Sequence, residues 1–163
     1  MESRAKILGH PVHPMLIVVP LGLFIAAVIF DAIALARGSS ALSTAAYWNI
    51  AAGIIGGLTA AVFGLIDWLA IPNNTRAKRI GLWHAGSNVV AILCFAAVWW
   101  MRHSAGEYTT TSGLFSIEVI ALIIGAVGGW LGGELVDRLG VGVDNGANLN
   151  APNSMSGRGA RAA

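Results

Sequence analysis

Four apolar runs, each about as long as a bilayer is wide, occupy most of this 163-residue chain. They are Met15–Ala36, Tyr47–Ala70, Trp83–Met101 and Leu114–Val136. An α-helix rises 1.5 Å per residue, so about 20 apolar residues cross the roughly 30 Å of bilayer hydrocarbon. The runs therefore predict an all-α fold, an integral membrane four-helix bundle, in which residues 1–143 form a single domain.

Composition excludes several other classes of protein. Charged residues are 11% of the chain, too few for the polar outer faces of a soluble four-helix protein. The basic residues form no single patch, so nucleic acid is not an expected partner. The lone cysteine, Cys94, has no partner for an intramolecular disulfide. The tail of residues 144–163 is rich in Gly, Ala, Asn and Ser, and it is predicted to be disordered.

The placement of Lys and Arg predicts the orientation of the bundle. With four spans, both termini and the middle link lie on one side. That side carries eight of the ten basic residues, Arg4, Lys6, Arg76, Lys78, Arg79, Arg138, Arg158 and Arg161, whereas the other side has Arg37 and Arg102. Because basic residues are enriched on the cytoplasmic side, both termini are predicted to be cytoplasmic. The expected location is the bacterial inner (plasma) membrane, as a multi-pass protein in the lipid bilayer.

Polar residues in three of the runs lie eighteen positions apart, which is five helical turns and hence one face. The pairs are His13 with Asp31, Asn49 with Asp67, and His84 with Arg102. We expect these faces to turn inward, because charge facing lipid is costly. On the outer side, Arg102 is expected to pair with Asp31 or Glu118, since charges in membrane helices are usually paired.

Three of the four histidines fall in a polar group on the predicted cytoplasmic side. The group is His10, His13, Asp67, His84, Asn88 and Glu134. Pro11 and Pro14 follow two of these histidines, and a residue before proline is disfavoured in the helical region. The sequence therefore predicts a stiff, non-helical segment that holds the imidazoles of His10 and His13 at the membrane edge.

Neutral imidazole is the commonest metal ligand, which makes this group a candidate binding site. His13 and His84 are candidate axial ligands of one haem b, which would be non-covalent because no Cys-x-x-Cys-His motif is present. His10, His13 and His84 are alternatively candidate ligands of a divalent metal. Asp67, Asn88 and Glu134 are supporting candidates, with Asp67 accepting an imidazole N–H. Under a third interpretation the histidines only bond to loop carbonyls and to Asp67.

Small residues recur at helical spacing in the second and fourth runs. They are Gly53, Gly56, Ala60 and Gly64 in the second run, and Gly125, Gly129 and Gly133 in the fourth, with Gly128 and Gly132 beside them. Small residues four apart let helix backbones approach closely. We therefore expect most of these glycines to serve packing, with Gly129 at a helix interface.

Motifs at both ends of the chain resemble a known family. They are Gly9-His10-Pro11-Val12-His13-Pro14-Met15 near the start and Gly132-Gly133-Glu134-Leu135-Val136 with Gly140-Val141-Gly142-Val143 near the end, joined by Asp67-Trp68 and His84 with Asn88. Over residues 8–143 the chain is similar to the bacterial predicted membrane proteins called domain of unknown function 2231. The resemblance implies a four-helix membrane protein related to cytochrome-b-like bundles, some relatives being associated with Rieske-type iron–sulfur modules. Asp137 stands where the family pattern has an aromatic residue.

Three functions remain open from the sequence. The first is a redox-associated subunit that binds haem b or a metal, with a redox protein or a second copy of the chain as partner. The second is a non-catalytic membrane scaffold or assembly protein. The third is a small transporter component, although no ionisable residue lies at mid-membrane, where ion pathways usually need one. No nucleophile–base pair or phosphate loop indicates a catalytic residue, so we expect no enzymatic activity of the chain on its own.

Overall fold

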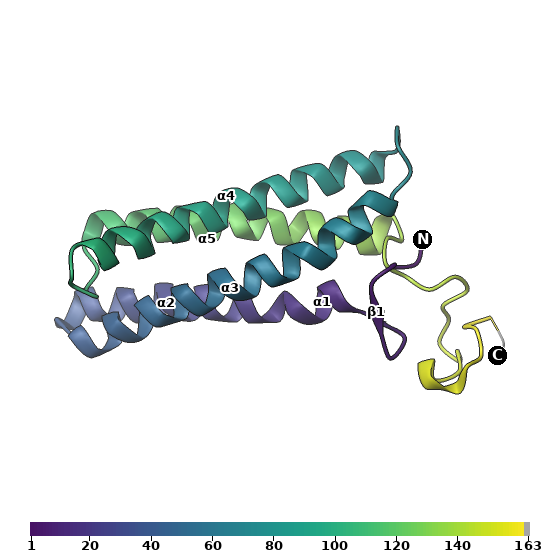
Figure 1. The fold of residues 1–163 in the computed structure, drawn as a ribbon, viewed down its shortest axis with the longest axis horizontal. Coiled ribbons are helices and arrows are strands. Elements are labelled where there is room, and N and C mark those ends of the chain that lie inside the picture. The colour runs from purple at the N-terminus through teal and green to yellow at the C-terminus, as the bar shows by residue number, and fades with distance from the viewer. Residues whose placement is uncertain (162–163) are drawn as a thin grey trace.

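The computed structural model describes residues 1–161, and its four long helical spans lie along one axis (Figure 1). The spans are Val12–Arg37, Ser40–Ala70, Arg76–Ser104 and Ser112–Arg138, and each is long and apolar enough to cross a membrane. Many large apolar side chains remain exposed along them. Such a surface suits hydrocarbon better than water, and the predicted all-α, four-span fold is confirmed.

The first span is interrupted once. Helix α1 is Val12–Leu16 and helix α2 is Val18–Arg37. Pro20 has no N–H to donate to the carbonyl of the residue four before it, so the hydrogen-bond ladder is weakened at this point. His13 lies inside α1 and is helical, so the prediction of an extended His13 is wrong. Pro14 is the third residue of the helix, and the first turn tolerates proline because its N–H groups have no helical acceptor.

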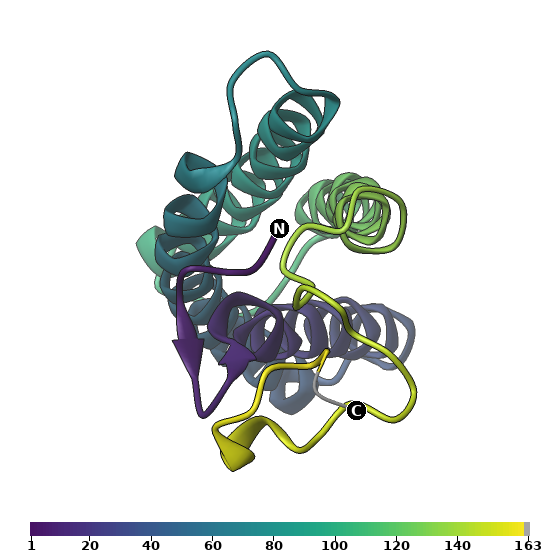
Figure 2. The same cartoon turned by 90° about the vertical axis from the view of Figure 1, so that its right-hand side faces the viewer.

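A two-residue turn connects a small β-hairpin in front of α1. Strand β1 is Lys6–Ile7 and strand β2 is His10–Pro11, paired antiparallel. Between them Leu8 and Gly9 have φ of 51° and 84°, so both are left-handed, as a type I′ turn requires. His10 is thus extended, as predicted, and the hairpin projects from the end of the bundle (Figure 2).

The remaining helices begin earlier than the apolar runs do. They are α3 (Ser40–Ala70), α4 (Arg76–Ser104) and α5 (Ser112–Gly133), and α5 continues as a π-helical turn, η1 (Glu134–Arg138). Each helix follows a hydroxyl residue whose side chain accepts an N–H three residues on, namely Ser39, Thr75 and Thr111. These N-caps satisfy orphan donors at the helix start, so each helix extends beyond its apolar run.

The helices pack as two hairpins. Helix α2 packs mainly against α3, and α4 against α5, so we call α1–α3 the first hairpin and α4–α5 the second hairpin. The two meet where the rings of Phe24 and Phe95 stack, with centroids 4.1 Å apart. Gly53 makes room for this stack, because a Cβ there would lie 2.6 Å from the ring of Phe24.

The glycines of α5 that face α4 are not the ones that the sequence predicted. Cβ atoms built at Gly128 and Gly132 would lie within 3.1 Å of side chains on α4. At Gly129 and Gly133 a Cβ would meet nothing within 4 Å. The prediction that Gly129 lies at an interface is therefore wrong. Adjacent residues are about 100° apart around a helix, so two neighbouring glycine rows point in different directions. The row of Gly128 and Gly132 is the one that faces α4.

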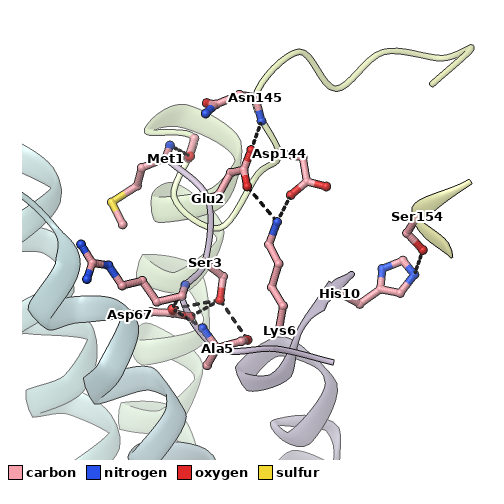
Figure 3. Close-up of polar contacts among 12 residues, drawn as sticks. Met1, Glu2, Ser3, Ala5, Lys6, His10, Asp67, Asp144, Asn145 and Ser154 are labelled. Atoms are coloured by element: carbon pink, nitrogen blue, oxygen red, sulfur yellow. Dashed lines mark hydrogen bonds and ion pairs between the residues drawn. The ribbon is translucent and has the colours of Figure 1, made fainter. Parts of the chain in front are cut away.

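The N-terminus and the C-terminal tail up to residue 161 lie at one end of the bundle (Figure 1), which we call the histidine end; the opposite end is the arginine end. The N-terminal segment crosses the histidine end and contacts the chain that follows η1 (Figure 3). Lys6 pairs with Asp144 and with Glu2, and Glu2 accepts the N–H of Asn145. That N–H, together with the Lys6 ammonium, lowers the pKa of the Glu2 carboxyl.

The tail of residues 144–163 was predicted to be disordered. Residues 162–163 lie outside the described residues, and residues 144–161 have local structure. They contain turns and a short 3₁₀ helix, η2 (Ser154–Ser156). The Ser154 hydroxyl lies 3.3 Å from Nε2 of His10, so η2 contacts the β-hairpin. The disorder prediction rested on composition, and composition does not reveal a side-chain contact to the N-terminal segment.

Candidate functional site

His13 reaches from α1 to the backbone of α3. Its Nδ1 lies 2.8 Å from the carbonyl oxygen of Ala60. In a helix that oxygen already accepts the N–H of the residue four positions on, which is Gly64. A Cβ at Gly64 would lie 2.9 Å from Cε1 and Nδ1 of His13. The missing side chain at position 64 therefore opens the path by which the imidazole reaches a helix carbonyl.

His84 makes the same arrangement in the second hairpin. Its Nδ1 lies 2.8 Å from the carbonyl oxygen of Gly128 on α5. The residue four positions on is again a glycine, Gly132, where a Cβ would lie 3.1 Å from Cε1 of His84. Each hairpin thus offers one histidine, one helix carbonyl and one glycine in the same relative positions.

The two imidazoles meet between the hairpins. Their ring centroids are 6.1 Å apart and the ring planes are 83° apart. Both side chains are partly buried. The sequence placed His13 and His84 in one polar group, and the structure brings their two rings next to each other.

The carbonyl contacts fix which ring nitrogen carries hydrogen. A carbonyl oxygen only accepts, so Nδ1 of His13 and of His84 must be the protonated nitrogen of a neutral ring. Each Nε2 then keeps its lone pair. Within residues 1–161 neither Nε2 has a hydrogen-bond partner. Histidines that ligate metals commonly donate the other ring N–H to a backbone carbonyl or a carboxylate in this way.

Asn88 supports His84 from one turn further along α4. Its Nδ2 donates to the carbonyl of His84 at 2.8 Å and lies 3.5 Å from the ring Nδ1. A Cβ at Gly128 would lie 2.8 Å from this amide. Asn88 therefore fills the space beside the imidazole, in line with its expected supporting place.

The other predicted members of the site bind elsewhere. Asp67 accepts from the Ser3 hydroxyl at 2.8 and 2.9 Å and from the N–H of Arg4 at 2.7 Å, so it holds the N-terminal segment (Figure 3). Glu134 pairs with Arg76 at 2.5 Å. These contacts correct the expectation that Asp67 orients an imidazole: the helix carbonyls take that N–H instead.

The three-histidine metal site is not assembled. His10 lies on the β-hairpin, where its ring contacts Ser154 rather than His13 or His84. Across residues 1–161 no group of three or more His, Cys, Asp or Glu side chains could hold a metal ion. The His10 ring contacts η2 instead, so nearness in the sequence did not bring it to the other two imidazoles.

A second polar cluster fills the arginine end. The side chains of Arg102, Asp31 and Glu118 are all 0% exposed. Nη1 of Arg102 lies 2.7 Å from Oδ2 of Asp31 and 3.3 Å from Oε1 of Glu118. The expected pairing of Arg102 with an acid is confirmed, and the guanidinium contacts the carboxyl groups of both Asp31 and Glu118.

Backbone and hydroxyl groups complete this cluster. Nη2 of Arg102 donates to the carbonyl oxygens of Ser43 at 2.7 Å and of Tyr108 at 2.6 Å. The Ser43 hydroxyl donates to Asp31 at 2.8 Å and accepts the N–H of Thr110 at 2.8 Å. Ser43 was not predicted from the sequence. The available signal was its spacing of four residues from Tyr47, which places both residues on one face of α3.

Aromatic side chains cover one flank of the cluster. Tyr47 is buried, and its ring stacks on Tyr108 at 4.5 Å and on Trp99 at 5.7 Å. The Tyr47 hydroxyl lies 3.0 Å from Nδ1 of His103. His103, the histidine expected to stay out of the binding site, is thus at the opposite end of the bundle from the other three.

Comparison with known proteins places this architecture in a family. A family model described as predicted membrane protein (DUF2231) matches residues 9–145. The chain belongs to this family. For this DUF2231 protein the match begins at Gly9, in the turn of the β-hairpin, and ends beyond η1, so it contains both histidine contacts and the arginine cluster.

One curated protein is similar over part of the same chain. The glycerol-3-phosphate acyltransferase of Rhizobium meliloti (strain 1021) is 31% identical over 105 residues, which cover 63% of the DUF2231 chain and 50% of the acyltransferase. The chain spans about half the length of that relative. No solved structure matches this DUF2231 chain.

Proposed function

We propose that this membrane protein binds one non-covalent haem b through His13 and His84, as a small redox-associated subunit. The observation that carries the proposal is the matched pair of Nδ1 contacts to the carbonyls of Ala60 and Gly128. Both contacts leave the lone pair of Nε2 available to bind a metal. Both also fix the orientation of the ring through the other nitrogen, Nδ1.

The number of ligands favours haem over a bare metal ion. Structural metal sites such as those of zinc take four protein ligands, whereas haem iron needs only the axial ones. One ion can bind two imidazoles only when the rings lie close together, because a metal–nitrogen bond is about 2 Å long. The observed centroid separation is 6.1 Å.

In this proposal each residue of the chain has a defined task. Nε2 of His13 and Nε2 of His84 would hold the iron, while Ala60 and Gly128 fix the tautomers through their carbonyls. Haem would supply one-electron transfer, since its iron changes oxidation state while the axial ligands stay in place. The basic residues of the termini and the middle link support placing this end on the cytoplasmic side of the inner membrane.

The test is the visible spectrum of the full chain, expressed in membranes with haem supply and purified in detergent. We expect a Soret band, with reducible haem at one per chain. His13→Ala and His84→Ala should each abolish the band. His10→Ala is the matched control at the same end, because His10 contacts Ser154 and not the ring pair. His103→Ala is the control at the arginine end.

Three results would count against haem. A wild-type protein with neither haem nor stoichiometric metal would leave the scaffold function, in which the histidines only tie helices together. A bound metal without a Soret band would replace haem by a metal ion. A Soret band that survives in both His13→Ala and His84→Ala would move the ligands elsewhere.

A further inference from the structure

The buried cluster at the arginine end has one more acid than it has base. Asp31 and Glu118 both accept from Nη1 of Arg102, and all three side chains are 0% exposed. If all three were ionised, one uncompensated negative charge would be buried inside a membrane span. Such a charge is expensive in a low-dielectric interior unless it is neutralised.

The hydrogen bonds show which carboxyl group is the poorly satisfied one. Asp31 receives Nη1 and Nη2 of Arg102 and the hydroxyl of Ser43, at 2.7, 3.4 and 2.8 Å. Glu118 receives a single bond of 3.3 Å. Its Oε2 is buried without a hydrogen-bond partner, as is Nε of Arg102, among the residues that the structure describes. An ionised carboxylate would need donors at both oxygens.

No neighbouring element supplies the missing positive charge. Helix α3 contributes Ser43 and Tyr47, and the loop after α4 contributes the carbonyl of Tyr108. His103 turns its Nδ1 to the Tyr47 hydroxyl instead of to a carboxylate. Arg102 is therefore the one cation that contacts the two acids within residues 1–161.

We propose that Glu118 is a proton-binding site, uncharged in the resting protein and in exchange with water at the arginine end. The proton resides on the Glu118 carboxyl, leaves it to water as the carboxylate forms, and returns by the reverse step. A monovalent metal ion suits the site less well, because the Arg102 guanidinium 3.3 Å from Glu118 would repel it. The proposal is independent of haem at the other end.

The cluster lies beside a loop at the arginine end of the bundle. Arg102 lies in the last turn of α4, and residues 105–111 form the loop that covers the cluster. That loop is tied to the cluster by the carbonyl of Tyr108 and the N–H of Thr110. Opening these two bonds would release the loop from the cluster that contains Glu118.

Infrared spectroscopy of the purified full chain tests the proposal, because a protonated carboxylic acid has its own carbonyl-stretch band. At neutral pH we expect one such band, which shifts when the protein is transferred into heavy water. Glu118→Gln should remove it. Glu107→Gln, the same change on an exposed residue of the covering loop, should retain it. Asp31→Asn should also remove it, because Glu118 then becomes the sole counter-ion of Arg102 and ionises.

Isotope labelling of wild-type protein covers the case in which Glu118→Gln does not fold. Carbon-13 in glutamate side chains should shift the band, whereas carbon-13 in aspartate side chains should leave it in place. Absence of the band in wild type, its survival in Glu118→Gln or in Asp31→Asn, or a shift with labelled aspartate would each overturn the proposal. A band that appears only when sodium is removed would replace the proton by a sodium ion.

Discussion

His13 and His84 make equivalent contacts in the two hairpins: each Nδ1 lies 2.8 Å from a carbonyl oxygen of the neighbouring helix. In both cases a glycine stands four residues after that carbonyl, where a side chain would otherwise block the ring. The relationship ties each imidazole to a rigid helix rather than to a loop. It also makes the glycines as informative to mutate as the histidines.

Gly132→Ala should displace the imidazole of His84, because the added Cβ would lie 3.1 Å from its Cε1. Loss of such an orienting contact typically weakens metal binding about 10–100-fold. Titration of the purified protein with haem measures the change. Gly129→Ala is the control: it adds the same methyl group to α5, where nothing lies within 4 Å. Equal haem affinity in the two variants would contradict the assigned role of Gly132.

Arg102→Met should destabilise the protein strongly, because it leaves two buried acids without their cation. Removing one partner of a buried ion pair costs about 3–5 kcal/mol. The free energy of unfolding in detergent gives the comparison. Arg37→Met, an exposed arginine at the same end of the bundle, should cost at most about 1 kcal/mol. Similar losses in both variants would mean that the Arg102 cluster contributes no specific stability.

Asp67→Ala should free the N-terminal segment and leave any haem spectrum unchanged. The carboxylate accepts from Ser3 and from the N–H of Arg4, and it contacts no imidazole. Hydrogen–deuterium exchange of residues 3–7 should therefore speed up, because the hydrogen bonds that hold this segment are lost. Asp137→Ala, at an exposed position of η1, should leave that exchange as it is. Loss of haem from Asp67→Ala would restore the role predicted from the sequence.

A reporter fused to the C-terminus should be active in the cytoplasm. Eight of the ten basic residues lie in segments on the side of the two termini. The N-terminus and the C-terminal tail up to residue 161 share one end of the bundle, so a single reporter fixes the orientation of all four spans (Figure 1). A reporter fused in the loop of residues 105–111 should give the opposite result. Two cytoplasmic readings would be incompatible with this topology.

The sequence alone determined the four spans and the pairing of Arg102. About 20 apolar residues have to form a helix in a membrane, because backbone groups find no water there, so length and composition suffice. A charge near the membrane interior needs a partner, and Asp31 and Glu118 were the available acids at that depth. The placement of His13 and His84 at the same end of the bundle also followed, since both lie where spans begin on that side.

Only the tertiary structure decided what surrounds those residues. The acceptors of the two imidazoles are backbone carbonyls, which every residue has, so the sequence marks them only indirectly, through Gly64 and Gly132. Two neighbouring glycine rows on α5 fit the same spacing rule, and only packing against α4 selects one. The sequence placed Asp67 and His10 on the same side of the membrane as His13 and His84. The fold of the N-terminal segment and of the turn at Leu8 and Gly9 gave them other partners, because long-range contacts leave no local pattern.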